Sequence, residues 1–189
     1  MLETTTCAQT RDEPEALGLG RLYRENASRI RQLLVRLGGP HADAEDLTHE
    51  VFVIAWEHIH QLREPAAVHA WLNAIAVKVA AGARRRARLR RFLGLEVAGE
   101  VSDRRTPASE FESREASRIV YQVLEGLTEK KRTTFILFEL QGLSGEEIAL
   151  ATGSPLKTVW TRLFHARREF ADGIARLQAN EERARATWR

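Results

Sequence analysis

Hydrophobic residues recur three or four positions apart along almost the whole chain, which is the spacing of one face of an α-helix. No stretch alternates apolar and polar residues between turn signals, so the pattern predicts no β-sheet. In the first half it predicts three helices: one over about 17–37, one from Asp43 to a break at 63–65, and one from about 67 through an arginine cluster. Their short connections indicate a compact three-helix bundle over residues 17–91.

A break in the pattern separates this bundle from the rest of the chain. Residues 92–112 lose the helical period and gain Gly, Pro, Ser and acidic side chains, which predicts a flexible linker. The polar segments at the two ends, 1–16 and 179–189, are expected to be a flexible N-terminus and a charged tail.

Helical spacing returns over residues 113–178, where the pattern predicts four helices. The expected N-caps of the last three are Thr128, Ser144 and Ser154, with Glu147 completing a capping box. The predicted fold class is therefore all-α, with two small helical domains joined by a flexible linker.

Composition and charge narrow the classes of function. Of the 189 residues, 43% are hydrophobic and 29% are charged, which excludes wholesale disorder. Both helical halves are net basic, whereas 1–16 and 92–112 are net acidic, so each half is expected to face an anion. The single cysteine, Cys7, excludes an internal disulfide framework. Without a signal peptide or a bilayer-length apolar run, we expect a cytoplasmic protein with no membrane insertion.

The sequence lacks the motifs of the common enzyme classes. It has no P-loop, no GxGxxG and no GxSxG, and His49-Glu50 begins an HExxH motif that ends in Val53 instead of His. We therefore expect no enzymatic activity, no metal ion and no cofactor.

The strongest local motif is a capped helix, a turn containing Gly153 and a second capped helix, over residues 144–170. In a helix-turn-helix the second helix enters the major groove of DNA. A helical wheel places opposite its apolar stripe the residues Lys157, Thr161, Phe164, His165 and Arg168, flanked by Thr158 and Trp160. Arg162 lies nearer the flank, which suits DNA phosphates. The alternative is an ordinary solvated helix face.

The third helix carries six arginines within residues 84–91. Trp71 and Lys78, upstream of them, share one stripe with Arg85, and this stripe is displaced from the apolar face. Such a stripe can neutralise phosphates and stack on an unpaired base. The alternatives are a solvated basic face and a Trp71 that belongs to the core.

The second helix has an acidic face instead. Asp46, His49, Glu50, Val53 and Glu57 lie along one side of it, and the other positions are almost all apolar. An acidic stripe does not suit DNA, so it is either a solvated face or a docking surface for a basic protein.

Two blocks of sequence resemble the extracytoplasmic-function (ECF) sigma factors of bacterial RNA polymerase, within the sigma-70 family. Residues 43–52 (DAEDLTHEVF) resemble the helix of sigma region two that docks on the polymerase clamp. Residues 70–72 (AWL) with the arginines at 84–86 resemble the next helix, which handles the −10 element. Residues 141–149 (QGLSGEEIA) and 154–159 (SPLKTV) resemble sigma region four.

The resemblance implies an initiation factor that binds the β and β′ subunits of core RNA polymerase and promoter DNA. It further implies control by an anti-sigma factor and association with the nucleoid when active, with no small-molecule substrate. The implied polymerase-binding residues are Asp46, His49, Glu50, Val53 and Trp56. The implied −10 residues are Trp71, Lys78, Arg84, Arg85 and Arg86. The implied −35 residues are Lys157, Thr158, Trp160, Thr161, Arg162, His165 and Arg168.

The chain departs from the family pattern at several of these positions. His49 stands where Gln is usual in the clamp helix. Lys78 and Gly82 stand where Asn and a polar residue are common in the −10 helix. Trp160 and His165 replace residues that are usually basic on the −35 face. Promoter sequence preference is therefore the property that transfers least from the family.

Two other functions would explain parts of the sequence. A stand-alone helix-turn-helix regulator would account for residues 144–170 but not for the acidic second helix, and it would normally need a dimer. An adaptor or anti-regulator that binds only proteins would not need six arginines on one helix.

Overall fold

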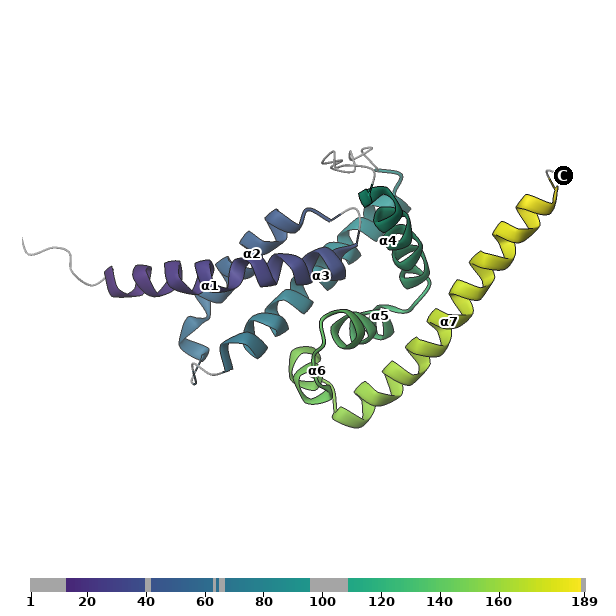
Figure 1. Ribbon diagram of the computed structural model, residues 1–189. Helices are drawn as coiled ribbons and strands as arrows, with labels where there is room; N and C mark the ends of the chain where they lie inside the picture. The colour runs from purple at the N-terminus through teal and green to yellow at the C-terminus, as the bar shows by residue number, and fades with distance from the viewer. Residues whose placement is uncertain (1–12, 40–41, 63, 65–66, 96–108, 188–189) are drawn as a thin grey trace, which may run out of the picture.

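A computed structural model describes residues 13–39, 42–62, 64, 67–95 and 109–187. Within these ranges every regular element is helical, as the hydrophobic pattern predicts, and the order is α1, α2, η1, α3, α4, α5, η3, α6, α7 (Figure 1). Cys7 and most of the predicted N-terminal segment and linker lie outside the described residues.

The first half is the predicted three-helix bundle. α1 (Glu13–Gly38), α2 (Ala44–Glu57) and α3 (Val68–Phe92) pack against one another, with the short 3₁₀ turn η1 (Ile59–Gln61) after α2. α2 begins just after Asp43, as predicted, and Asp43 caps it, because its carboxylate accepts hydrogen bonds from the backbone N–H groups of residues 45 and 46. The fully buried side chains of this core are Ile30, Leu33, Leu34, Val51, Ala55, Leu72 and Ala76.

The second half contains α4 (Ser109–Glu125), α5 (Glu129–Phe135), the π-helical turn η3 (Ile136–Leu140), α6 (Gly145–Thr152) and α7 (Leu156–Thr187). The capping box is confirmed, since Ser144 accepts from the N–H of Glu147 and the Glu147 carboxylate accepts from the N–H of Ser144. α6 ends at Gly153, whose φ of 59° is the left-handed conformation that glycine adopts without strain.

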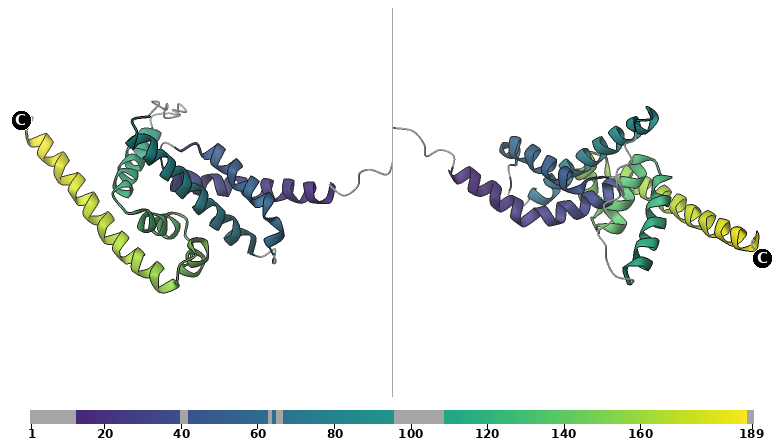
Figure 2. Two further views of the ribbon diagram at one scale, coloured as in Figure 1. Left: turned by 180° about the vertical axis from the view of Figure 1, so that it is seen from behind. Right: turned by 90° about the horizontal axis from the view of Figure 1, so that it is seen from above.

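Three expectations about this half need correction. Thr128 precedes α5 but makes no side-chain capping bond. Ser154 does not cap α7 either: its hydroxyl accepts from Arg162 at 2.8 Å, and the carbonyl of Pro155 accepts the first helical bonds. The predicted tail from residue 179 is helical, because α7 continues to Thr187 and projects beyond the body (Figure 2).

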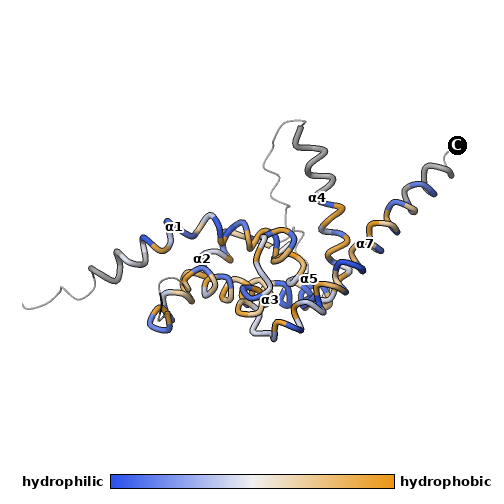
Figure 3. The backbone as a smooth tube through the Cα atoms, turned by 60° about the horizontal axis from the view of Figure 1, so that its bottom comes forward, coloured by the Kyte–Doolittle hydropathy of each residue, from blue (hydrophilic) through white to orange (hydrophobic). Residues whose placement is uncertain are grey.

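The two halves pack against each other, which the sequence pattern did not predict. α6 lies directly against α3, and η3 lies against α1. Buried residues from both halves form one continuous core, which includes Leu72 and Val79 of α3 together with Ile148 and Ala151 of α6. The hydrophobic stretches gather where α1, α2, α3 and α5 meet, whereas the outer end of α7 is largely hydrophilic (Figure 3). The chain is therefore one folded unit in this arrangement.

A polar contact sits within the first bundle, between α1 and α3. Arg29 Nη1 donates to the side-chain oxygen of buried Asn73 at 2.7 Å, while the Nε and Nη2 atoms of Arg29 are buried without a hydrogen-bond partner. Burial lowers the pKa of Arg29 below its ordinary value. Asn73 therefore supplies an acceptor that this desolvated cation needs.

Replacing Asn73 with Ala should lower the free energy of unfolding by about 1–3 kcal/mol, because a buried donor loses its acceptor. Urea unfolding followed by circular dichroism measures the change. Glu25→Ala is the matched control, since it removes the partner of the exposed Arg21. Equal stability of Asn73→Ala and the wild type would show that the contact contributes nothing.

Candidate nucleic-acid and protein interfaces

The five residues predicted to bind a protein partner lie on the outer side of α2. Leu47, Val51 and Phe52 turn inward and are buried. Asp46 and His49 are exposed, Val53 is 57% exposed and Trp56 39% exposed. Large apolar side chains left in solvent beside carboxylates are typical of a protein-binding surface.

Tyr23 of α1 extends this surface, and the sequence reasoning missed it. Its ring packs edge-on against Phe52 with centroids 4.8 Å apart and lies nearly parallel to His49 at 6.4 Å. The Tyr23 side chain is itself partly exposed. Only tertiary packing brings Tyr23 beside α2, so no local spacing could have indicated it.

The predicted −10 residues lie along α3 in unequal environments. Lys78, Arg85 and Arg86 are exposed. Trp71 is half-buried, and part of its ring packs against the hydrophobic core. Arg86 Nη2 lies 3.3 Å from the Glu50 carboxylate, which links the basic helix to the acidic face of α2.

Arg84 differs from its neighbours, because only 12% of its side chain is exposed. Its guanidinium is held by the carbonyl of Gly38 and by the carboxylates of Glu125 and Glu129 in the second half of the chain. In this arrangement Arg84 is not available to DNA. Its assignment to the −10 element stays a prediction that requires the two halves to separate.

Exposed apolar side chains that the sequence analysis did not single out lie among these arginines and just after them. They are Leu89 and Phe92 in the last turn of α3, and Leu93 and Leu95 directly after it, all more than half exposed. The end of α3 therefore has a mixed basic and apolar surface.

The helix-turn-helix presents the predicted reading face of α7 to solvent. Val159, Leu163 and Ala166 are buried against the domain, while Lys157, Thr161, His165 and Arg168 are exposed. Thr158 is half-buried at the edge of this face. Arg162 points back to the turn and holds Ser154, so its contact stiffens the entry to α7.

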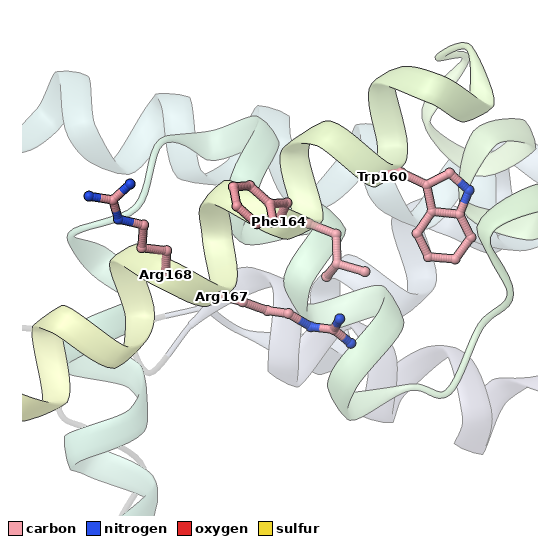
Figure 4. A pocket seen from close by; sticks show the side chains of 5 residues that line it. Trp160, Phe164, Arg167 and Arg168 are labelled. Atoms are coloured by element: carbon pink, nitrogen blue, oxygen red, sulfur yellow. The ribbon is translucent and has the colours of Figure 1, made fainter.

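Phe164 and Trp160 add aromatic surface to the same helix. Phe164 is 65% exposed, and an open groove of about 530 Å³ runs past Trp160, Phe164, Arg167 and Arg168 (Figure 4). Arg167 Nε lies 2.6 Å from Glu139 Oε1, which holds the guanidinium in place. The same guanidinium lies over the ring of Phe138, with its Cζ atom 5.2 Å from the ring centroid. The groove therefore combines aromatic surface with a fixed cation and the exposed Arg168.

Trp160 also has a structural role. Its ring contacts Phe138 edge-on at 5.6 Å, and it covers the backbone of Gly145 at the start of α6. A Cβ atom at Gly145 would lie 2.6 Å from the indole, so α6 and α7 meet at this point through glycine. The buried part of the Trp160 ring thus fixes how α6 and α7 pack against each other, and the rest of the ring remains exposed.

The described residues were also examined for membrane-spanning helices and for metal sites. None of their helices is both long and apolar enough to cross a bilayer. Among the same residues, no group of three or more His, Cys, Asp or Glu side chains could hold a metal ion.

Comparison with known protein families gives two matches along the chain. Sigma-70 region 2 matches residues 22–90, which cover most of α1 through α3. Sigma-70, region 4 matches residues 117–170, from within α4 to the middle of α7. The two matches leave the predicted linker between them.

Curated proteins of similar sequence carry a consistent name. The "ECF RNA polymerase sigma factor SigE" of Mycolicibacterium smegmatis is 31% identical over 162 residues, which span 82% of this chain and 61% of that protein. The "ECF RNA polymerase sigma-E factor" of Haemophilus influenzae is 33% identical over 144 residues, or 71% of this chain and 76% of that protein. Its namesake in Escherichia coli K12 is 33% identical over 137 residues and 72% of its length.

Two solved structures share the fold. CnrH, in complex with the cytosolic domain of CnrY, aligns with a TM-score of 0.60 at 23% identity, over 87% of this chain and 90% of that one. The sigma factor RpoE of Bartonella quintana, in complex with the anti-sigma factor NepR, aligns with a TM-score of 0.62 at 20% identity, over 84% of this chain and 97% of that one. At these sequence identities, the similarity shows that the fold is shared and nothing more.

The Gly145–Trp160 contact makes a prediction about the helix-turn-helix. Gly145→Ala should lower the free energy of unfolding by about 1–3 kcal/mol, because the added methyl overlaps the indole. In a Trp160→Ala background the same change should cost less, since the space is then vacant. Thermal unfolding of the four proteins measures this, and equal costs in both backgrounds would contradict the contact.

Proposed function

The chain belongs to the sigma-70 family, among its extracytoplasmic-function members, and from that premise we propose that it binds core RNA polymerase and directs promoter-specific transcription initiation. One observation carries the proposal: a single chain holds both an acidic and apolar protein-binding face on α2 and a helix-turn-helix with an exposed reading face on α7. A protein that positions polymerase on DNA needs both surfaces.

The α2 face is the proposed site for core polymerase. Asp46 and Glu50 supply negative charge at the rim, which steers a basic partner, and Val53 with Trp56 supplies apolar area to bury. His49, where the family usually has Gln, stacks beside Tyr23 and extends the same face. The partner would be the polymerase clamp.

Promoter contacts divide between α3 and α7. Trp71, Lys78 and the arginines of α3 would bind the −10 region, stacking on unpaired bases and neutralising phosphates. On α7, Lys157 and Thr161 would meet base edges of the −35 element, and Arg162 would reach phosphates once released from Ser154. The chain itself would perform no chemistry, since polymerase forms the RNA bonds.

Further partners and location follow from the family. Solved neighbours were captured with CnrY and with the anti-sigma factor NepR, so we propose that an anti-sigma factor restrains this chain as well. The chain would work in the bacterial cytoplasm and associate with the nucleoid when active.

Run-off transcription tests the function directly. Core RNA polymerase is supplied with and without this protein on templates selected from a randomised promoter library. Transcripts that start at a common motif only when the protein is present would support the proposal. DNA binding without core binding would instead favour a stand-alone helix-turn-helix regulator, and core-independent protein binding without DNA binding would favour an adaptor.

Reversing charge on α2 should remove polymerase binding. Asp46→Arg combined with Glu50→Arg should weaken binding of core polymerase at least about tenfold, because like charges would then face a basic partner. Co-purification and fluorescence anisotropy measure binding, and circular dichroism confirms the fold. Glu64→Arg, an exposed charge reversal elsewhere in the same half, is the control. Unchanged co-purification would place the polymerase site elsewhere.

The reading face of α7 makes a separate prediction. Lys157→Ala or Thr161→Ala in the holoenzyme should cost about 1–3 kcal/mol of discrimination between the best −35 element and single-base variants of it. Competition binding against a set of such variants measures the loss. Gln178→Ala, exposed on the projecting part of α7, is the control. A uniform loss on all sequences would reassign the residue to phosphate contact.

A further inference from the structure

The end of α3 carries large apolar side chains that the fold leaves in water. Every residue from 85 to 95 is exposed, so this part of the chain extends past the core that holds the rest of α3. Phe92 is 85% exposed, and Leu89, Leu93 and Leu95 are each more than half exposed. Apolar side chains gathered at one place on a protein surface indicate an interaction site.

A defined turn holds this end of the helix. The N–H of Leu95 donates to the carbonyl of Arg90 at 3.0 Å. The N–H of Gly94 donates to the carbonyl of Arg91 at 3.1 Å, which completes a Schellman turn. Gly94 has the φ of 66° that such a turn needs. The turn folds residue 95 back toward the last turn of the helix, so Leu95 extends the apolar surface.

The apolar side chains share one side of the helix, and arginines flank them. A helix turns by about 100° per residue, which places Leu93 about 40° to one side of Leu89 and Phe92 about 60° to the other. By the same rule, Arg88 and Arg90 lie about 100° from Leu89 on opposite sides. An apolar sector roughly 100° wide therefore has a cation on each border.

No acidic residue offsets this charge within the helix. α3 contains no Asp or Glu from its first residue to its last. Arg84 and Arg86 pair with glutamates of other elements, whereas Arg85, Arg88 and Arg90 are exposed. The complement of this helix end is an anionic surface that also accepts apolar groups.

An anionic phospholipid bilayer has both properties. The backbone of a DNA duplex offers phosphates but no apolar layer into which Phe92 and Leu93 could be withdrawn from water. In a helix that lies at a bilayer surface, apolar side chains sink below the headgroups, and flanking arginines extend their charged ends to the lipid phosphates. Stable peripheral binding takes two signals, and here an apolar sector and a group of cations supply them.

We propose that residues 85–95 form a docking site for anionic phospholipid surfaces. Phe92 and its leucine neighbours would enter the headgroup layer, and Arg88 and Arg90 would bind lipid phosphates. The chain would lie on the bilayer without crossing it, which agrees with the lack of a membrane-spanning helix among the described residues. The proposal does not depend on the proposed function, because it uses only the exposed end of α3.

Sedimentation of the full-length chain with lipid vesicles tests this proposal. Vesicles of phosphatidylcholine alone are compared with vesicles of equal parts phosphatidylglycerol and phosphatidylcholine. The wild type should pellet with the anionic vesicles and stay in the supernatant with the neutral ones. Binding should weaken as salt rises, because salt screens the attraction between arginines and phosphates.

Two double variants separate the apolar contribution from the electrostatic one. Leu89→Ser with Phe92→Ser should lower the affinity for anionic vesicles at least about tenfold, because less apolar area leaves water. Arg88→Gln with Arg90→Gln should lower it about tenfold at low salt and less at high salt. All four positions are exposed, and circular dichroism confirms that the variants keep the fold.

Matched controls come from other exposed positions of the chain. Leu150→Ser removes an apolar side chain that is 68% exposed on α6. Arg24→Gln with Arg31→Gln removes two exposed cations from α1. Both controls should bind anionic vesicles within about twofold of the wild type, since neither changes the end of α3.

A fluorescent label shows whether the apolar sector enters the lipid. The environment-sensitive dye NBD is attached at Leu93→Cys in a Cys7→Ser background, and its emission should rise on anionic vesicles. The matched position is Ala87→Cys, which is exposed about 160° around the same helix from Leu89. The label at this position should change much less, because it faces away from the bilayer.

Three results would overturn the proposal. One is a wild type that does not pellet with anionic vesicles at low salt. Another is a Leu89→Ser/Phe92→Ser variant that binds them as well as the wild type, which would reduce the contact to general charge attraction. The third is an equal rise of NBD emission at both labelled positions. If vesicle binding is absent and Arg88→Gln/Arg90→Gln instead weakens binding to a duplex oligonucleotide, this helix end is a nucleic-acid site.

Discussion

The arrangement of this protein depends on one buried cation, Arg84, and on the carboxylates that hold it. A guanidinium that is almost removed from water must be paired, because an unpaired buried charge costs several kcal/mol. Glu125 and Glu129 provide that pairing from the other half of the chain. Arg84 therefore couples α3 to α4 and α5 in the second half of the chain.

Charge is divided between neighbouring helices in a way that separates the two proposed partners. α2 presents carboxylates and exposed apolar side chains, which suit a basic protein surface, whereas α3 presents arginines and a half-buried tryptophan, which suit nucleic acid. The ion pair between Glu50 and Arg86 joins the two surfaces. A basic partner that binds Glu50 would compete with Arg86 for the same carboxylate.

Local chemistry in the sequence was sufficient for the helices and insufficient for their assembly. The Ser144–Glu147 capping box and the end of α6 at Gly153 depend on residues within one turn of chain, and the structure confirms both. The predicted start of the second helix at Asp43 is confirmed as well. The prediction of Ser154 as a cap was wrong because its hydroxyl accepts from Arg162, eight residues further along the chain. That contact depends on how α7 packs against the turn, which local sequence does not show. The contacts of Arg84 with residues 41 and 45 positions away, and of Tyr23 with α2, leave no mark on helical periodicity. The exposure of residues such as Asp46, Lys157 and Thr161 could therefore be predicted from the helical pattern, while the burial of Arg84 could not; the binding roles of these residues stay predictions.

The most direct measurement is the distance between the two halves of the isolated chain in solution. Spin labels at His69→Cys in α3 and Gln178→Cys in α7, in a Cys7→Ser background, allow this distance to be measured by pulsed electron resonance. We expect a short, narrow distribution when Arg84 is present and a shift toward longer distances in Arg84→Gln, because this variant loses the ion pairs with Glu125 and Glu129. A distribution that Arg84→Gln leaves unchanged would contradict the account.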